Sequence, residues 1–136
     1  MSIVYAYFVV KLTKMEQHIC HISLGSNVSA AYIRLAKEHL LGIFPGIVFG
    51  PELCTAPIGM QHNFTPFTNQ TAEFETILTE EELHSILKHL ERKAGRTAEE
   101  AKKEIIRLDV DLVKYDTLIR KPEDWQRLFN THPNEL

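Results

Sequence analysis

The sequence predicts an α+β fold in which an antiparallel sheet carries two helices on one of its faces. Residues 108–112 alternate apolar and acidic side chains, and this period of two is typical of a half-buried strand. Apolar residues recur at three- and four-residue spacing near 30–41 and 80–94, which predicts two amphipathic helices. With three further strand-like runs, the order becomes strand, helix, strand, strand, helix, strand. This order is typical of the split βαβ, or ferredoxin-like, plan.

The first strand and the first helix are separated by a tight turn. Residues 18–24 form a short apolar run that ends at Gly25-Ser26-Asn27, which predicts a strand entering a turn. Ser29 is a suitable N-cap for the helix near 30–41. We expect Gly42 to end this helix in a left-handed conformation.

The second and third strands enclose a long loop. Residues 47–53, bounded by Pro45-Gly46 and Pro51, are a second strand candidate. Residues 54–66 are irregular and rich in Pro, Gly, Gln and Asn, so they are too long for a simple hairpin turn and form a candidate binding loop. Residues 67–78 resume the alternation of a strand.

The second helix carries the clearest start signal in the chain. Thr79 and Glu82 form a capping box, and the apolar stripe that follows ends before Gly95. The same capping pattern recurs at 97–100 and predicts a short exposed helix through residue 104. The acidic strand follows within 105–116, then a short helix at 122–129 and a polar tail at 131–136.

Two carboxylates leave one face of the last strand together. Asp109 and Asp111 alternate with apolar residues, so their Cα atoms lie about 6.6 Å apart. At an effective dielectric of about 20, their repulsion would cost on the order of 2 kcal/mol if both were ionised and partly buried. An oxygen-only, doubly negative site suits Mg²⁺ with water and phosphate oxygens. The alternative is a half-buried strand whose polar face is simply wet.

Composition excludes several classes of function. The 136-residue chain is one domain by length, and its 44% apolar content and net charge of -3 are those of an ordinary globular protein. Without a run of Lys and Arg, we expect no nucleic-acid or membrane partner. The P-loop pattern is absent, and the seven histidines form no HxxxH or HxH pair. Cys20 and Cys54 lack CxxC spacing, which favours reduced, buried thiols in the cytoplasm.

The first 14 residues stand apart from this pattern. The apolar run at 3–10 has neither the basic region nor the cleavage site of a signal peptide, and it is too short to span a bilayer. We therefore expect residues 1–14 to form an extra strand or an N-terminal extension of a cytoplasmic protein.

Five ordered blocks carry a family resemblance. They are Ile22-Ser23-Leu24-Gly25-Ser26-Asn27, Thr55-Ala56-Pro57-Ile58-Gly59, Phe67-Thr68-Asn69, Leu90-Glu91-Arg92-Lys93-Ala94-Gly95-Arg96 and Arg107-Leu108-Asp109-Val110-Asp111. Over residues 18–116 the chain resembles the 6-hydroxymethyl-7,8-dihydropterin pyrophosphokinases. The resemblance implies a ferredoxin-like fold and Mg²⁺-dependent transfer of pyrophosphate from ATP to the pterin hydroxymethyl group in the folate pathway. The substrates would be small molecules, a reduced pterin and ATP.

The resemblance also implies roles for individual residues. Asp109 and Asp111 would hold two Mg²⁺ ions between the ATP phosphates and the pterin hydroxyl. Arg107, beside them, would supply catalytic positive charge. The residues implied for pterin binding are Thr55, Pro57, Ile58, Phe67 and Asn69. Those implied for nucleotide binding are Glu91, Arg96, Lys103 and Leu112. For Glu91 the alternative is a solvated helix glutamate.

The chain departs from the family in two places. Lys103 stands where the family has a loop Trp and Ile106 where it has a second Arg, and the loop's Gly and Pro are gone. Because side chains alternate along a strand, Arg107 keeps the charge but is expected to point to the opposite face. The short segment 117–136 has no clear counterpart of the family's C-terminal nucleotide ligands. We therefore expect a better-formed pterin side than ATP side.

Three functional readings remain open from the sequence. The first is an active enzyme in which Lys102, Lys103 or Arg107 replaces the missing arginines. The second is a non-catalytic pterin-binding or regulatory protein. The third is a ferredoxin-like interaction domain whose first 14 residues add an edge strand that joins copies of the chain into a homo-oligomer.

Overall fold

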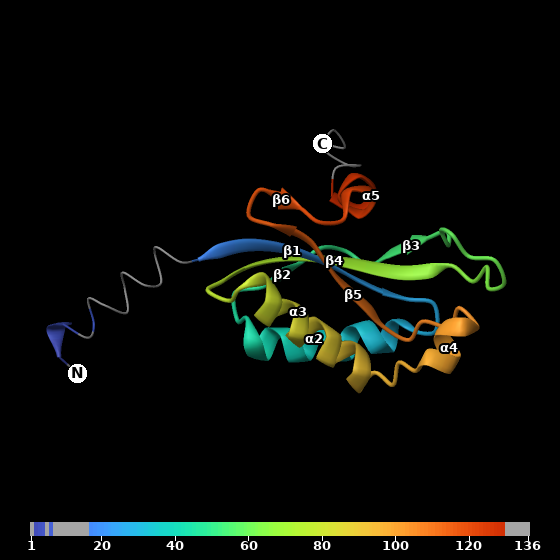
Figure 1. Ribbon diagram of the computed structural model, residues 1–136, viewed down its shortest axis with the longest axis horizontal. Helices are drawn as coiled ribbons and strands as arrows, with labels where there is room; N and C mark the ends of the chain where they lie inside the picture. Colours follow the sequence, from blue (N-terminus) through green and yellow to red (C-terminus); the bar gives the residue numbers. More distant parts are fainter. Residues whose placement is uncertain (1, 5, 7–16, 130–136) are drawn as a thin grey trace.

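The computed structural model describes residues 2–4, 6 and 17–129, and its elements follow the predicted order. Figure 1 shows one sheet with α2 and α3 against one face and the C-terminal elements against the other. The α+β prediction with both long helices on one face is therefore confirmed. The elements are β1 His18–Ser26, α2 Ala30–Ile43, β2 Val48–Phe49, β3 Leu53–Thr55, β4 Phe67–Thr76, α3 Glu80–Lys93, α4 Ala98–Lys102, β5 Asp109–Tyr115, β6 Leu118–Ile119, α5 Pro122–Asp124 and the π-helix η1 Trp125–Phe129.

The sheet is antiparallel and has β1 at its centre. Its six strands run in the order β2-β4-β1-β5-β6, and β3 also pairs with β4. On one side β1 pairs with β4, and on the other it places Ser23 opposite Asp111 and Gly25 opposite Asp109. This register puts the two aspartates next to the end of the central strand.

Two features of the sheet differ from the prediction of four strands. The strand expected at 47–53 is divided into β2 and β3, because Pro51 between them has no N–H to donate to a partner strand. The strand β6 forms a hairpin with β5, and Asp116 adopts a φ of 54° in the connecting turn. The sequence did not predict β6, because two residues, Leu118 and Ile119, are too few to show an alternating pattern.

The helix starts are confirmed, and one predicted helix end is wrong. The Ser29 side chain accepts from the Ala31 N–H, and the Thr79 capping box is complete. The helix α3 ends before Gly95, which has a φ of 94°. Gly42, however, stays helical, and α2 ends where the Phe44 N–H donates to the Leu40 carbonyl. A helical glycine costs only about 1 kcal/mol, which the packing of α2 offsets.

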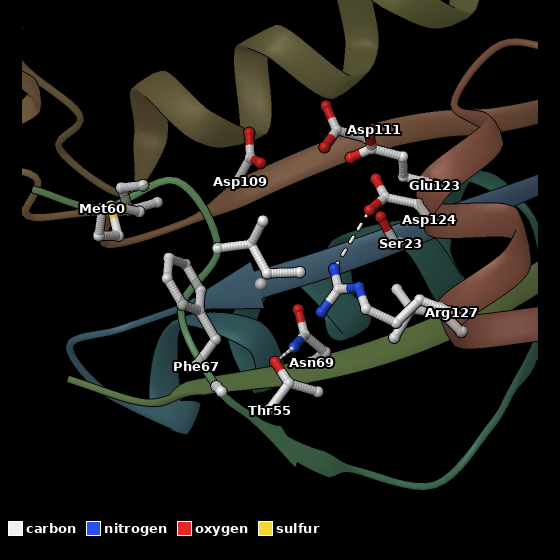
Figure 2. Close-up of a pocket in the computed structure, with 15 residues that line it drawn as sticks. Ser23, Thr55, Met60, Phe67, Asn69, Asp109, Asp111, Glu123, Asp124 and Arg127 are labelled. Atoms are coloured by element: carbon white, nitrogen blue, oxygen red, sulfur yellow. Dashed lines mark hydrogen bonds and ion pairs between the residues drawn. The ribbon is translucent and has the colours of Figure 1, made fainter. Parts of the chain in front are cut away.

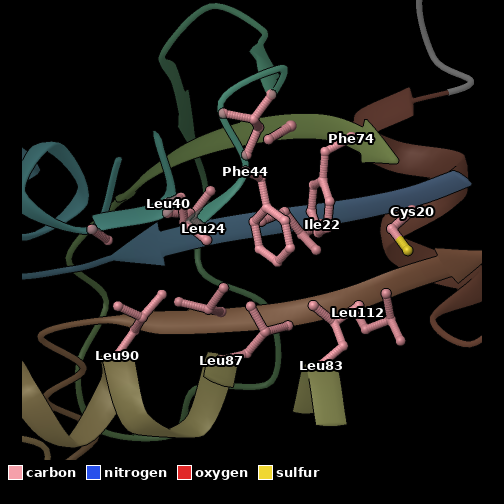
Figure 3. Close-up of a cluster of buried hydrophobic side chains, with 14 of the residues drawn as sticks. Cys20, Ile22, Leu24, Leu40, Phe44, Phe74, Leu83, Leu87, Leu90 and Leu112 are labelled. Carbon is pink, nitrogen blue, oxygen red and sulfur yellow. The ribbon is translucent and has the colours of Figure 1, made fainter. Parts of the chain in front are cut away.

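The main core fills the space between the sheet and the two long helices (Figure 3). Ile22 and Leu24 from β1 meet Leu83 and Leu87 from α3, and all four side chains are fully buried. Each buried side chain of this size contributes about 1.5–3 kcal/mol. Alternate β5 residues enter the same core, so the residues between them must face the other side of the sheet.

The two cysteines have different environments. Cys20 is buried in the core as predicted, and burial together with nearby acidic groups raises the pKa of its thiol to about 12. Cys54 is exposed on the short strand β3, so the prediction of a buried thiol is wrong there. Its strand pairs with β4 off the main path of the sheet.

The C-terminal helix docks on the opposite face of the sheet. The rings of Trp125 and Phe129 pack edge-on against His21 of β1, with centroids 5.1 and 5.3 Å away. Lys114 of β5 places its ammonium 4.4 Å from the centre of the Trp125 ring, and Leu128 is buried. We call residues 122–129 the C-terminal cap.

The predictions for the two ends of the chain fall mostly outside the described residues. Residues 3, 4 and 6 are helical and residue 2 has no regular structure, and the rest of the extra strand or extension predicted at 1–14 lies outside the described residues. The same holds for the polar tail at 131–136. Within the described part of the chain, no helix combines the length and the apolar character needed to cross a membrane.

Candidate active site

A cavity of about 310 Å³ opens on the sheet face opposite α2 and α3 (Figure 2). The central strands form its floor, the 56–66 loop forms one wall and the C-terminal cap forms another. The residues that line it are Ser23, Gly25, Thr55, Ala56, Ile58, Met60, Phe67, Asn69, Ile106, Asp109, Asp111, Glu123, Asp124, Arg127 and Leu128. The structure therefore brings most of the residues predicted for the pterin and metal sites into one cavity.

Asp109 and Asp111 project from β5 into this cavity, as the alternation predicted (Figure 2). Burial and the neighbouring Asp111 carboxylate raise the pKa of Asp109, although Glu91 and Arg96 lower it in part. The Arg96 guanidinium lies 3.3 Å from the Asp109 carboxylate. A divalent cation would relieve the unfavourable proximity of the two carboxylates more completely than one shared arginine.

The cavity offers an incomplete set of metal ligands. Among the described residues, no cluster of three or more His, Cys, Asp or Glu side chains is arranged to hold a metal ion. Two carboxylates fit Mg²⁺, which commonly takes one or two from the protein and fills its octahedron with water and substrate phosphates. The donor set therefore suits a cation that arrives with a phosphorylated ligand.

An aromatic ring and a buried amide face the aspartates across the cavity. Phe67 and Asn69 lie on the same side of β4, and the Asn69 amide donates to the Thr55 hydroxyl. Asn69 is nearly fully buried, at 7% exposure. A flat heterocycle with amide-like edges fits a ring face beside a group that both donates and accepts.

Gly25 is required for this arrangement. A Cβ atom at Gly25 would lie 2.9 Å from the Asn69 side-chain oxygen and 3.6 Å from the Phe67 ring. The glycine of the central strand thus leaves room for both cavity residues of the neighbouring strand. Of the remaining residues implied for pterin binding, Ile58 lines the cavity and Pro57 does not, although both of its neighbours do.

Glu91 is buried, so the alternative of a solvated helix glutamate is wrong. Its carboxylate accepts from the Val110 N–H at 2.8 Å and from Arg96 at 2.8 Å. Because β6 pairs only with the end of β5, the outer edge of β5 at Val110 has no strand partner and needs this acceptor. Glu91 therefore anchors α3 to the strand that carries the aspartates and orients Arg96 toward Asp109.

Three other predicted residues lie outside the cavity. Arg107 is held by Glu100 of α4 at 2.9 Å and donates to the Tyr32 hydroxyl at 3.4 Å, so it lies toward the helices, whereas Ile106 lines the cavity. Lys103 is exposed and lies 3.9 Å from Glu99. The Leu112 side chain is buried in the core, which leaves only its backbone for a ligand.

The C-terminal cap supplies cavity residues that the sequence did not reveal. Glu123, Asp124 and Arg127 line the cavity, and Arg127 lies 3.2 Å from Asp124 (Figure 2). The sequence shows that Asp124 and Arg127 are three residues apart in a predicted helix, but this spacing does not predict which face of the sheet the helix packs against. The aromatic pair Trp125 and Phe129, which anchors the cap, was the one sequence feature that indicated a buried face on this segment.

A model of the family described as 7,8-dihydro-6-hydroxymethylpterin-pyrophosphokinase matches residues 21–135. The match covers most of the chain and includes every residue that lines the cavity. No curated protein matches the chain.

Proposed function

Because the chain belongs to the 7,8-dihydro-6-hydroxymethylpterin-pyrophosphokinase family, we propose that it makes the pyrophosphate ester of a reduced hydroxymethylpterin in folate biosynthesis. The pterin hydroxymethyl oxygen would form a bond to the β-phosphorus of ATP. The bond from that phosphorus to the bridging oxygen would break, AMP would leave, and the hydroxyl proton would pass to solvent. One observation supports this proposal most, namely the shared cavity of the aspartate pair, Phe67 and Asn69.

The aspartate pair has the role of holding Mg²⁺ in this proposal. Bound Mg²⁺ would neutralise phosphate charge, on which phosphoryl transfer chiefly depends. Asp109 and Asp111 would provide its protein ligands, and Glu91 would keep β5 in place through the Val110 N–H. The backbones of both aspartates pair with the central strand β1, so the positions of their side chains depend on the sheet rather than on a loop.

In this proposal the pterin stacks on the Phe67 ring with its edge toward Asn69. Stacking uses the ring face, and the Asn69 amide can donate and accept along the heterocycle edge. The bond from Asn69 to Thr55 supports this geometry before any ligand arrives. The pterin side is therefore expected to bind without nucleotide.

The nucleotide side has fewer available cations. Arg127 is the basic residue among the described residues of the cavity, where four carboxylates also lie, those of Asp109, Asp111, Glu123 and Asp124. Arg96 reaches Asp109 from the edge of β5. Arg107 and Lys103 would have to leave their present partners to reach a phosphate. Mg·ATP is therefore expected to bind more weakly than the pterin.

This surplus of carboxylates favours one alternative, a pterin-binding protein without transferase activity. A turnover assay with Mg²⁺, ATP and 6-hydroxymethyl-7,8-dihydropterin separates the two by measuring AMP release. AMP formation that requires both the pterin and Mg²⁺ supports the enzyme. Saturable pterin binding without AMP formation supports the alternative. The reading as a self-associating domain depends on residues 1–14, most of which lie outside the described part.

A further inference from the structure

Glu104 has an unusual backbone conformation between α4 and β5. Its φ is 58°, in the left-handed region that non-glycine residues seldom adopt. Such a conformation persists where surrounding contacts determine it and commonly marks a functional position. The contacts of Glu104 therefore need an explanation.

The Glu104 carboxylate binds the backbone of the 56–66 loop. It accepts from the Gln61 N–H at 2.9 Å and from the His62 N–H at 2.6 Å. Hydrogen bonds to an ionised acceptor are shorter and stronger than neutral ones. Two successive loop amides thus converge on one side chain that lies more than 40 residues later in the chain.

The Glu104 carbonyl oxygen completes the connection. It accepts from the Asn63 amide at 3.0 Å and from the Asn27 amide at 2.8 Å. Asn27 in turn accepts from the Ile106 N–H at 2.8 Å. One residue therefore joins the end of β1, the 56–66 loop and the segment that leads into β5.

These contacts lie directly behind two walls of the cavity. Met60 precedes the bound loop amides and lines the cavity, and Ile106 follows Glu104 and also lines it. Figure 2 shows Met60 on the loop beside Phe67 and Asp109. Opening the contact would move the wall nearest the Phe67 ring.

We infer that Glu104 is a positioning residue that clasps the 56–66 loop against β5 and pre-forms the pterin side of the cavity before nucleotide binds. The inference rests on the proposed function for the identity of the ligand. If only a fraction of molecules has the loop in place, the apparent Kd rises by the inverse of that fraction. Loss of a clasp that keeps the loop closed should therefore weaken pterin binding without a direct effect on the Mg²⁺ ligands.

Full-length Glu104→Gly tests this inference. The variant removes the carboxylate, and glycine accepts a positive φ without strain, so the fold is expected to persist. Without ligand, hydrogen exchange at the Gln61 and His62 amides should rise about tenfold or more. By calorimetry, the Kd for 6-hydroxymethyl-7,8-dihydropterin should rise about tenfold. The Kd for Mg·ATP should change by less than about twofold.

Two matched variants separate the clasp from charge and from folding. Glu104→Gln keeps one side-chain oxygen for the loop amides and should recover part of the exchange protection and of the pterin affinity. Glu99→Gln makes the same charge change on α4, at a side chain that is 83% exposed and lies 3.9 Å from Lys103. It should match wild type in both measurements.

The possible outcomes are distinct. Unchanged amide exchange in Glu104→Gly overturns the clasp. Faster exchange with unchanged pterin affinity overturns its role in substrate binding. Failure of the wild-type protein both to bind pterin and to form AMP overturns the proposed function, and the pterin role of the clasp with it, whereas the exchange measurement still decides whether the contact forms.

Discussion

The two sides of the cavity differ in what holds their side chains. On the pterin side, Phe67 and Asn69 come from a long strand paired along its length with β1, and Asn69 is buried. On the nucleotide side, Arg96, Arg107 and Arg127 belong to helix ends and short segments, and each is paired with a carboxylate. Strand register fixes the first group. The second group is held by ion pairs with carboxylates that a bound phosphate can replace. The arginines must therefore change partners when the nucleotide binds.

The largest expected effect is on turnover. Asp111→Asn removes one of the two carboxylates that would hold Mg²⁺, and we expect AMP formation to fall about 10³-fold, since several kcal/mol of charge stabilisation are lost. The thermal midpoint should not fall, because the substitution also removes repulsion with Asp109. Melting by circular dichroism controls for folding. Wild-type activity in this variant would remove the pair from the mechanism.

The nucleotide side depends on a buried carboxylate. Glu91→Gln removes a carboxylate charge that is 3% exposed and pairs with Arg96 and Lys88, and it leaves Arg96 with Asp109 alone. Breaking a buried ion pair from one side costs about 3 kcal/mol. Urea denaturation should show a loss of this size. A loss below about 0.5 kcal/mol, which is typical of surface substitutions, would mean that Glu91 does not support β5.

The pterin side depends on one ring. Phe67→Ala removes the stacking face, and we expect the Kd for 6-hydroxymethyl-7,8-dihydropterin to rise about 100-fold, which corresponds to about 2.7 kcal/mol. The matched control is Phe64→Ala, three residues earlier on the 56–66 loop, at 68% exposure and outside the cavity. Equal affinities for the two variants in calorimetry would place the pterin elsewhere.

The comparison itself predicts unequal binding of the two substrates. Without the other ligand, the pterin should bind about tenfold or more tightly than Mg·ATP, because only its side of the cavity is already organised. Calorimetry with each ligand alone measures this difference. Tight Mg·ATP binding with rapid turnover would show that the arginines are already well placed. The two sides of the cavity would then be equally organised before binding.

The smallest effect concerns pH and the loop. Burial raises the pKa of Glu104, but the hydrogen bonds from Gln61 and His62 outweigh it and lower the pKa below its ordinary value of 4.5. The clasp is therefore fully present above pH 4.5 and is lost as the pH falls through the lower folded pKa. Amide exchange at Gln61, corrected for its intrinsic pH dependence, should accelerate only below that range. Acceleration already at neutral pH would show that the Glu104 carboxylate does not control the loop.

Local pattern predicted most of the fold and half of the site. Capping at Ser29 and Thr79 and the alternation around Asp109 act within a few residues, so the sequence shows them directly. The resemblance supplied Phe67 and Asn69, whose roles stay predictions until a ligand is bound.

Long-range contacts could not be predicted in this way. The burial of Glu91 follows from a missing strand partner at Val110, and the docking face of the C-terminal cap follows from His21 and Lys114 on distant strands. Glu104 looked like the end of an exposed polar helix, and nothing nearby in the sequence indicated its contact with Gln61. Gly42 was misjudged because packing of α2 outweighed a weak local preference.

The docking of the C-terminal cap gives the protein an intrinsic optical probe. Trp125 is the single tryptophan of the chain, and it stacks on Phe129 with the Lys114 ammonium above its ring. Indole emission depends strongly on nearby charge and on exposure to water. Because the same cap carries Asp124 and Arg127 into the cavity, a ligand that displaces their ion pair will change the fluorescence of Trp125. Binding to the unmodified chain can therefore be followed in real time without a label.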